Sequence, residues 1–368
     1  MGLARGMDRI VSPPTDLRPE SRAEPRPEGQ DAQVGVVMIG RNEGERLRRC
    51  IASTSGTAAR VYVDSGSTDD SVAWARSQGV AVVELAVPPK FTAARARNAG
   101  LERLLQDHPG LVYVQMVDGD CELAPGWLDA AREALERDPG LALVFGRRRE
   151  RFPERSIYNA FCDDEWNVPV GEAASGGGDV MVRVDALTAI NGYDPEMIAG
   201  EDPDMSVRLR KAGWRLYRID HAMTIHDAAI LRFGQWWRRT ERAGHAFGEL
   251  ADRHPGLREP DWRRQCRSIV LWGGILPALV VTMVLFAIVF GPLWLVPALA
   301  FAAVWPLQAL RIARKRRATL PPRQALLTGA FLMIGKLAEM IGLARFQIGR
   351  LTGRRSDLIE YNSGPARG

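Results

Sequence analysis

A long stretch without charged residues most strongly constrains how this chain can fold. No Asp, Glu, Lys or Arg occurs from residue 269 to residue 310, whereas the residues before it are rich in charge. One helical membrane crossing needs about 20 apolar residues, so this stretch fits two crossings with a turn at Gly291 and Pro292. The alternative is a very apolar helical hairpin buried in a soluble protein. We therefore predict a transmembrane hairpin over residues 268–310.

Arginine-rich runs flank the hairpin on both sides, at residues 262–267 and 311–317. Basic residues near membrane helices favour the cytoplasmic side, and two crossings return the chain to the side where it started. The part before the hairpin and the tail after it are therefore both expected in the cytoplasm. The predicted location is the inner or plasma membrane.

A third apolar segment, residues 325–351, differs from the first two because it contains Lys336, Glu339 and Arg345. Each of these charges would cost roughly 2.5 to 3.5 kcal/mol near the centre of a bilayer. We predict an amphipathic helix lying on the cytoplasmic surface, within a region of basic linker, helix and tail that spans residues 311–368.

The remaining composition limits the compartment and the partners. The net charge is +5, and much of the basic excess lies beside the apolar segments, where it suits anionic lipid heads rather than nucleic acid. Residues 1–33 are rich in Pro, Arg and Glu and are predicted to be a disordered tail without a signal peptide. The four cysteines show no paired spacing, which suits a reducing cytoplasm and gives no zinc site.

From residue 34 the chain alternates between apolar runs and helical patterns. The apolar runs, which predict strands, cover residues 34–39, 60–64, 80–85 and 111–117, and helical patterns near 44–54, 70–78 and 92–106 separate them. This order predicts an α/β fold with a mostly parallel, Rossmann-like sheet, in which ligands bind beyond the carboxyl ends of the strands.

Polar residues follow these predicted strands where a ligand site is expected. The fourth run ends in Asp118, Gly119 and Asp120, which could form a plain turn. Two carboxylates at a strand end also suit a hard divalent cation such as Mg²⁺ or Mn²⁺ that carries a substrate phosphate. No Walker A or G-x-G-x-x-G pattern accompanies them, which argues against ATPases and dinucleotide-binding enzymes.

Six segments together resemble the family 2 glycosyltransferases of the GT-A fold. In chain order they are residues 36–51, 63–72, 91–101, 117–128, 175–195 and 199–216. The resemblance implies a GT-A catalytic domain over residues 34–230 that binds a nucleotide-diphosphate sugar. Residues 231–267 are expected to form interfacial helices, in which Trp236 and Trp237 lie either at the lipid headgroups or in a packed core.

The resemblance also assigns roles to individual positions. The residues that it places at the nucleotide-sugar are Asn42, Glu43, Asp64, Ser65, Arg97, Asn98 and Asp118. Asp118 and Asp120 fill the D-x-D motif of the family, with Asp120 the favoured ligand of Mn²⁺ or Mg²⁺. His226 lies at the place along the chain where some metal-dependent members carry an additional metal ligand, although a lone histidine is more often structural.

Glu201 and Asp202 form the predicted catalytic acid pair. By resemblance, Asp202 matches the catalytic base of inverting members, which would take a proton from the attacking sugar hydroxyl. The alternative is a structural role, since acids favour the first turn of a helix and Pro203 suits it as well.

Two departures from the family pattern narrow the expected activity. Ser65 stands where many relatives carry a second Asp, which leaves uridine and guanosine donors open. Processive synthases of the family carry a Q-x-x-R-W motif. Here Gln235 and Arg238 match its Gln and Arg, but Arg239 stands in the place of its Trp. We therefore expect a metal-dependent inverting enzyme of glycan or polysaccharide biosynthesis that moves one sugar to a lipid-linked or membrane-proximal acceptor.

Three alternatives remain open from the sequence. A polyprenyl-phosphate acceptor would not need Asp202 as a base, because its attacking oxygen is already anionic. A nucleotidyltransferase would use similar acids and release pyrophosphate. An inert membrane scaffold would keep the fold without the reaction.

Overall fold

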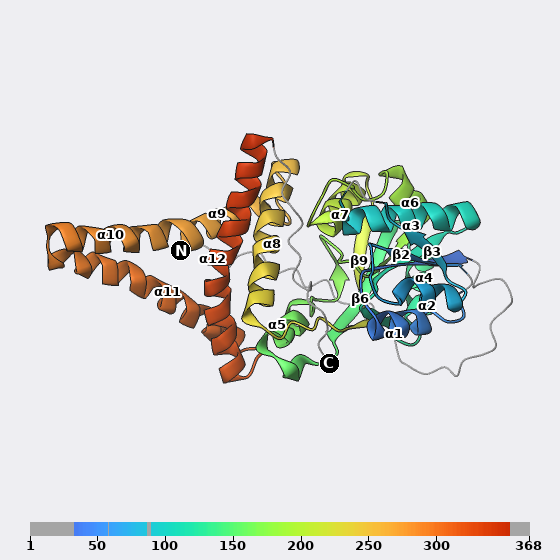
Figure 1. Ribbon diagram of the computed structural model, residues 1–368, viewed down its shortest axis with the longest axis horizontal. Helices are drawn as coiled ribbons and strands as arrows, with labels where there is room; N and C mark the ends of the chain where they lie inside the picture. Colours follow the sequence, from blue (N-terminus) through green and yellow to red (C-terminus); the bar gives the residue numbers. More distant parts are fainter. Residues whose placement is uncertain (1–32, 58, 87–89, 354–368) are drawn as a thin grey trace. The chain divides into compact units, whose positions relative to one another are not determined.

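The computed structural model describes residues 33–57, 59–86 and 90–353. The predicted tail over residues 1–33 lies outside the described residues except for Gln33. Figure 1 shows an α/β region with long C-terminal helices beside it, two of which extend away from it as a hairpin. All described residues from Gln33 onward belong to one compact unit.

The first half of the sheet is parallel, as the sequence predicts. β1 (Val34–Gly40) pairs in parallel with β2 (Ala59–Asp64) on one side and β4 (Tyr113–Asp118) on the other, and β3 (Ala81–Glu84) pairs with β2. β1, β2 and β4 are apolar runs with both faces buried, because helices cover both sides of the sheet. The connecting helices α1 (Glu45–Ser53), α2 (Ser71–Ser77) and α3 (Ala93–Asp107) match the three helical patterns.

The second half of the sheet is mixed. β8 (Val180–Arg183) runs antiparallel to β4 and to β6 (Leu141–Glu150), and β6 pairs in parallel with β9 (Arg215–His226). Two short strands, β5 (Cys121–Leu123) and β7 (Gly171–Glu172), pair antiparallel with β9. The full order is β3-β2-β1-β4-β8-β6-β9-β5, with β7 beside β9. The structure therefore brings the end of β9 next to the turn that follows β4.

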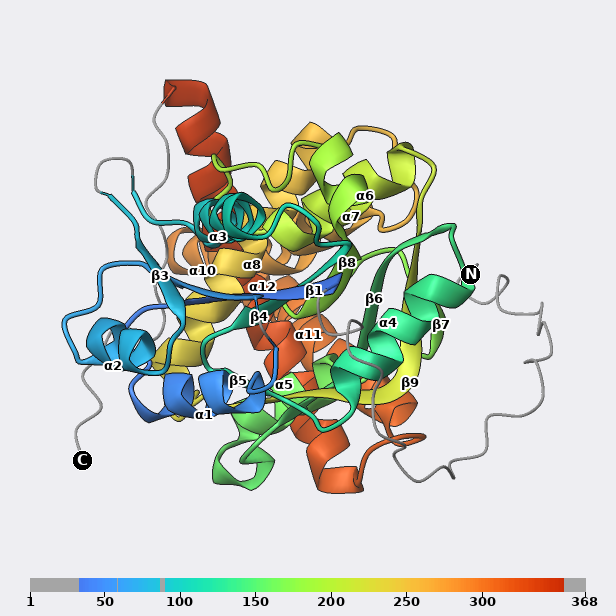
Figure 2. The same cartoon turned by 90° about the vertical axis from the view of Figure 1, so that its right-hand side faces the viewer.

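Helices cover both faces of this sheet. Figure 2 shows α3, α6 (Val184–Ala189) and α7 (Glu201–Lys211) on one face and α1, α2 and α4 (Trp127–Arg137) on the other. The core between them is made of buried Val, Leu, Met and Ala side chains of the strands and of the inward helix faces. Helix α5 (Ile157–Glu165) lies between the sheet and the C-terminal helices (Figure 1).

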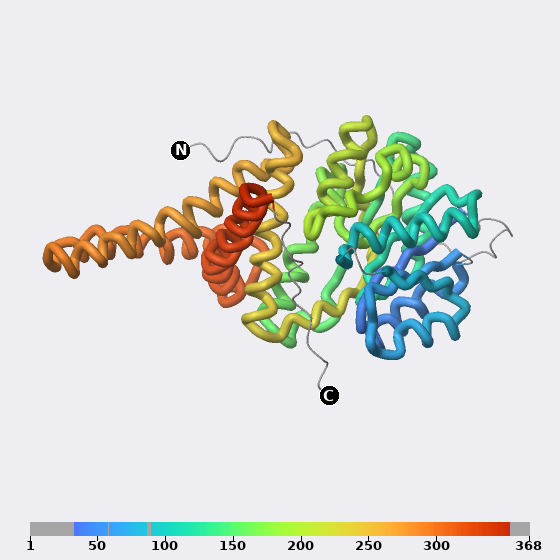
Figure 3. Tube along the Cα trace, turned by 45° about the horizontal axis from the view of Figure 1, so that its top comes forward, coloured from blue at the N-terminus to red at the C-terminus, as the bar shows by residue number. Residues whose placement is uncertain are grey.

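The C-terminal helices form a hairpin and a packed pair. α9 (Trp262–Ile269), the π-helical turn η3 (Val270–Ile275) and α10 (Leu276–Phe290) form one continuous helix. The chain reverses at Gly291, whose φ of 108° favours glycine, as the sequence predicts, and η4 (Pro292–Trp294) leads into α11 (Leu295–Arg316). Figure 3 shows this hairpin extending away from the packed pair of α8 (Phe233–Arg253) and α12 (Pro322–Thr352).

Three helical segments are long and apolar enough to cross a membrane. They are Trp262–Phe290, Pro292–Arg316 and Pro322–Thr352. The most apolar window of the third is 39% buried within the protein, against 0% and 6% for the other two. The third segment is therefore covered by protein to a much greater extent than the hairpin.

The two tryptophans of α8 settle one alternative left open by the sequence. Trp236 is 7% exposed, stacks on Tyr158 of α5 with ring centroids 5.9 Å apart, and meets Phe331 of α12 edge-on at 5.1 Å. Trp236 thus packs in a small internal core, while Trp237 is partly buried at its edge.

Candidate active site

The D-x-D segment forms a tight turn between β4 and β5. The Gly119 N–H donates to the Ile39 carbonyl at 2.7 Å, and a Cβ at Gly119 would lie 3.0 Å from the same oxygen. The turn therefore lies directly against the end of β1. Asp118 and Asp120 flank Gly119, so the turn carries both carboxylates.

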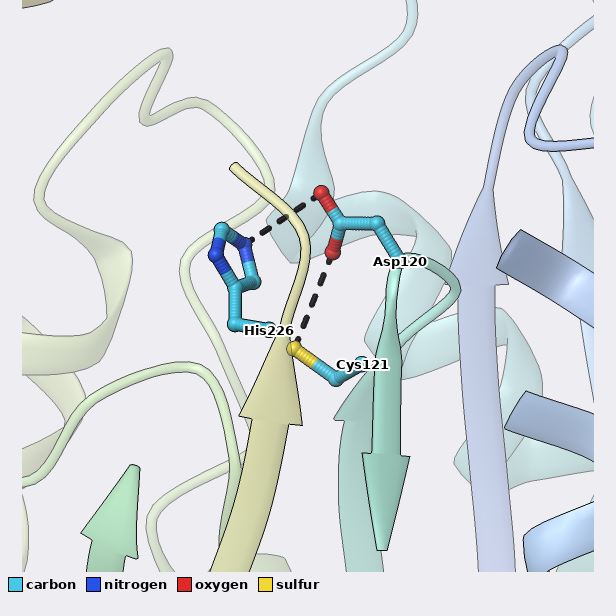
Figure 4. Close-up of side chains that lie close together, drawn as sticks. All are labelled: Asp120, Cys121 and His226. Atoms are coloured by element: carbon cyan, nitrogen blue, oxygen red, sulfur yellow. Dashed lines mark hydrogen bonds and ion pairs between the residues drawn. The ribbon is translucent and has the colours of Figure 1, made fainter. Parts of the chain in front are cut away.

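Asp120 meets His226 across the β5–β9 pairing, in which Cys121 lies opposite His226. His226 Nε2 is 3.3 Å from Asp120 Oδ2, as Figure 4 shows. Burial would raise the pKa of Asp120, but the charges of His226 and Arg46 hold it well below its usual range. Burial would lower the pKa of His226, but Asp120 and Glu150 raise it to about 9. The two side chains therefore favour each other's charged forms, and a cation bound between them would replace the His226 proton.

Two residues that the sequence analysis did not single out lie against the His226 ring. Glu150 Oε2 lies 3.7 Å from His226 Nδ1, and Trp166 packs edge-on at 4.7 Å between ring centroids. Histidines that ligate metals usually present their second ring nitrogen to a carboxylate. Glu150 lies on the side of His226 where such a carboxylate is found, at a distance longer than a hydrogen bond.

The donor atoms gathered here fit a divalent cation. One atom each from Asp120, Cys121 and His226 lie within 4.8 Å of one another, as do atoms from Asp118, Cys121 and Asp179. Carboxylate and imidazole ligands suit Mn²⁺, and burial raises the pKa of the Cys121 thiol, which keeps it protonated and a weak ligand. Asp120 and His226 are thus the side chains best suited to hold a metal ion.

Arg97 joins the D-x-D turn to the acid pair of α7. From α3, Arg97 Nη2 donates to Asp118 Oδ1 at 2.8 Å, and Nη1 donates to Glu201 Oε1 at 2.9 Å. Nη1 also lies 3.3 Å from Asp202 Oδ1, and the Arg97 side chain is only 3% exposed. One buried cation therefore faces three carboxylates from two separate motifs, the D-x-D motif and the acid pair.

The two acids of the pair ionise differently. Burial raises the pKa of Asp202 to about 7, with Glu201 and Asp118 adding to the rise and Arg97 opposing it. Burial would also raise the pKa of Glu201, but Arg97 and Arg242 hold it below its usual range. Glu201 is therefore the ionised partner of Arg97, and Asp202 is the group that exchanges a proton near neutral pH.

Asp179 and Arg148 complete the site and were not predicted from the sequence. Asp179 is fully buried, accepts from the Asp118 N–H at 3.0 Å and from Thr224 Oγ1 at 2.7 Å, and pairs with Arg148 at 2.8 Å. The signal that could have found Asp179 is the glycine run before it. A Cβ at Gly178 would lie 2.5 Å from Arg97 Nη2, so close packing favours glycine at this position.

The loops after β1 and β2 are tied to each other. Asn42, at φ 56°, accepts from the Thr68 N–H at 2.7 Å and donates its own N–H to Ser67 Oγ at 2.9 Å. Asp64 is 2% exposed and accepts from the N–H groups of Gly66 and Ser67 at 2.9 and 2.8 Å. Asp64 therefore shapes the loop from inside.

Three other predicted residues lie at different places around the site. Burial and the Asp120 carboxylate raise the pKa of Glu43 to about 8, against the opposing Arg46. The Ser65 N–H donates to the Gly40 carbonyl at 3.0 Å, which joins the two loops once more. Asn98 Nδ2 donates to the Tyr193 carbonyl at 2.7 Å, and Asn98 Oδ1 accepts from the Tyr193 N–H at 2.9 Å.

Comparison with known proteins assigns this arrangement to a family. The family described as Glycosyl transferase family 2 matches residues 35–167, and Glycosyl transferase family group 2 matches residues 116–312, which is more than half of the chain. The chain belongs to glycosyltransferase family 2. Both matches include the D-x-D turn of this glycosyltransferase, and the second extends from there through the hairpin.

Individual relatives agree with this assignment. This chain is 28% identical over 274 residues to the pre-mycofactocin glycosyltransferase of Mycobacterium tuberculosis. The matched residues cover 70% of this chain and 54% of that protein. The chain is 30% identical over 92 residues to the succinoglycan biosynthesis protein ExoA of Rhizobium meliloti, or 24% of this chain and 28% of that one. The chain thus spans about half or less of the length of these curated relatives.

A solved structure shares the fold. The mannosyltransferase PcManGT of Pyrobaculum calidifontis, in complex with GDP-Man and Mn²⁺, is 18% identical, with a TM-score of 0.55 over 85% of this chain and 87% of that one. The GT-A fold that the sequence predicted is confirmed by this likeness.

Proposed function

We propose that this glycosyltransferase is metal-dependent and inverting, and that it moves a single sugar from a nucleotide-diphosphate donor to a lipid-linked or membrane-proximal acceptor. The observation that carries the proposal is Arg97, which brings the D-x-D acid Asp118 and the acid pair of α7 to one buried guanidinium. Donor and base are thereby brought to one place, as a single displacement at the anomeric carbon requires.

Each residue has a chemical task in this proposal. Asp202, with a pKa of about 7, accepts the proton of the attacking sugar hydroxyl. Arg97 and the ionised Glu201 keep Asp202 oriented, and Asp118 faces the donor beside them. A divalent cation held by Asp120 and His226, when bound, supplies positive charge for the departing diphosphate. The likeness to PcManGT, solved with GDP-Man and Mn²⁺, supports a nucleotide-sugar donor and Mn²⁺.

The proposed nucleotide-binding wall consists of Asn42, Glu43, Asp64 and Ser65. These residues come from the loops after β1 and β2, at the carboxyl edge of the parallel strands, where the fold binds ligands. In this proposal Asp64 acts through the loop that it shapes, because its carboxylate is buried, whereas Asn42 lies at the exposed junction of the two loops.

We further propose that α12 lies on the cytoplasmic surface of the membrane beside α8. The two helices run side by side in the same direction, since Gly335 lies against Trp236 and Thr240, and Arg350 pairs with Asp252 at 3.0 Å. The charged residues of α8 occur along its whole length and include Arg238, Arg239, Glu241, Arg242, Glu249, Asp252 and Arg253. A helix packed on such a partner shares its depth, which supports a surface position for α12 and cytoplasmic chain ends.

Donor binding tests the proposed function directly. Calorimetry of UDP- and GDP-sugars with the full-length protein, with and without Mn²⁺ or Mg²⁺, should show binding that depends on the cation. Asp120→Asn should remove this dependence, whereas Asp220→Asn, which removes the same charge from an exposed position on β9, should not. Equal donor affinity with and without the cation would refute the metal-dependent site.

A further inference from the structure

An open groove lies outside the candidate active site, between α5 and the start of α12. Its volume is about 430 Å³, within the usual range for small-molecule sites. Pro153, Glu154, Ser156, Ile157, Ala160 and Phe161 line one side. Pro321, Arg323, Gln324 and Leu327 line the other. Most of the wall is apolar, and Arg323 is its one cation among the lining residues.

The groove lies where the membrane hairpin ends. Arg316, the last residue of α11, pairs with Asp164 of α5 at 3.3 Å, which fixes the end of the hairpin beside this helix. Phe331 of α12 packs on Phe161 and Tyr158 of α5, with ring centroids 5.4 and 5.7 Å apart. With the hairpin spanning a bilayer as the sequence predicts, the groove opens at the level of the lipid headgroups.

Positive charge gathers around this opening. The basic residues at the end of α11 and the start of α12 are Arg311, Arg314, Lys315, Arg316, Arg317 and Arg323. Among the described residues, Arg316 is the only one of these six with an ion pair to an acid. Glu154 is the one carboxylate among the residues that line the groove, and it is exposed. The α11–α12 side of the groove is thus strongly cationic.

We propose that this groove binds one anionic phospholipid of the bilayer, with an acyl chain along its apolar wall and the phosphate against Arg323. The apolar lining suits a hydrocarbon chain, the unpaired cations suit a phosphate, and the end of α11 delivers both from the same bilayer leaflet. No predicted donor or base residue lines the groove, so the lipid site is separate from the transfer site.

Native mass spectrometry of the full-length protein released from detergent tests this proposal. The probes are dioleoyl phosphatidylglycerol and dioleoyl phosphatidylcholine, which share the same acyl chains. The wild type should retain one phosphatidylglycerol at collision energies that remove phosphatidylcholine. Arg323→Gln, which removes the cation, and Leu327→Trp, which fills the groove, should each lower this retention at least fivefold.

A matched control separates the groove from general surface charge. Arg264→Gln removes one exposed positive charge from α9, at the start of the first helix of the hairpin, and should leave phosphatidylglycerol retention unchanged. Equal retention of both lipids by the wild type would overturn the proposal, as would an equal loss in Arg264→Gln and Arg323→Gln. Displacement of phosphatidylglycerol by an equimolar polyprenyl phosphate would also overturn it, because the groove would then belong to an acceptor lipid.

These measurements need neither a donor nor a metal. A failure of the lipid site therefore leaves the proposed glycosyl transfer untouched, and a failure of donor binding leaves the lipid site untouched. A melting curve for each variant shows whether it folds, and two variants of different chemistry keep the test decisive if one does not.

Discussion

Replacing Asp202 with Asn should stabilise this glycosyltransferase at high pH and leave its stability unchanged at low pH. The pKa of Asp202 is about 7 in the folded protein, against an ordinary value of 3.8. Such a carboxyl binds its proton more tightly when folded, so stability falls as pH rises from about 4 to about 7. At about 1.4 kcal/mol per pKa unit, the ionised carboxyl destabilises the fold by about 4 kcal/mol above pH 8, and Asn avoids this penalty.

The neighbouring acid provides a control of opposite sign. The pKa of Glu201 lies below its usual range, so its ionised form stabilises the fold above pH 4.5 and this stability is lost as pH falls. Glu201→Gln should therefore lower the melting temperature at pH 8, where Asp202→Asn raises it by several degrees. Thermal unfolding of the full-length protein in detergent, from pH 4.5 to pH 9, measures both. A melting-temperature difference for Asp202→Asn that is the same at pH 5 and pH 8 would refute the reasoning.

The same variant distinguishes two classes of acceptor. With a hydroxyl acceptor, kcat/KM of the wild type should fall about tenfold between pH 8 and pH 6, because Asp202 is protonated below about pH 7. Asp202→Asn should then lower kcat by about 10²- to 10⁴-fold. Retention of most activity would instead indicate a polyprenyl-phosphate acceptor, whose oxygen needs no base.

Other parts of the molecule give equally direct expectations. Asn98→Ala should lower stability by about 1 to 3 kcal/mol, since its amide binds the backbone before α7, but should leave donor affinity within twofold; a tenfold weaker donor Kd would show direct contact. Gly342→Leu should lower the melting temperature sharply, because a Cβ there would lie 1.9 Å from a carbonyl oxygen of α8, whereas Gly234→Leu, in open space, should not. Cysteines introduced at Leu326 and Leu351, the exposed ends of α12, should both react with an impermeant maleimide from the cytoplasmic side; reaction from opposite sides would contradict a surface helix.

The parallel half of the sheet could be predicted because each strand carries its own signal. β1 and β4 are short apolar runs buried on both faces, and their helices follow in regular alternation. The mixed half gives no such signal. β6 begins as an apolar run and ends in Arg147, Arg148, Arg149 and Glu150, and its pairing with β8 and β9 depends on segments far along the chain. Strand direction there is decided by tertiary contacts that no local pattern records.

The same distinction applies to the site. Asp118, Asp120 and Asp202 stand in motifs that can be recognised in one dimension. The contact of Arg97 with Glu201 joins residues 104 positions apart, and that of Asp118 with Asp179 joins residues 61 apart. Spacing in the sequence therefore identifies the acids, but it does not indicate which cation neutralises which acid or which of them takes up a proton.

The close pairing of α8 and α12 makes the apolar hairpin an insertion between two helices that pack on each other. Backbone meets backbone where Gly244 of α8 lies against Glu339 of α12, so α12 covers a face of α8 that would otherwise be bare. A water-soluble form of the enzyme should therefore not simply end at Ile269. Replacing α10 and α11 with a short polar linker removes the anchor and keeps α12 on its partner, which makes the hairpin, rather than the C-terminus, the separable module.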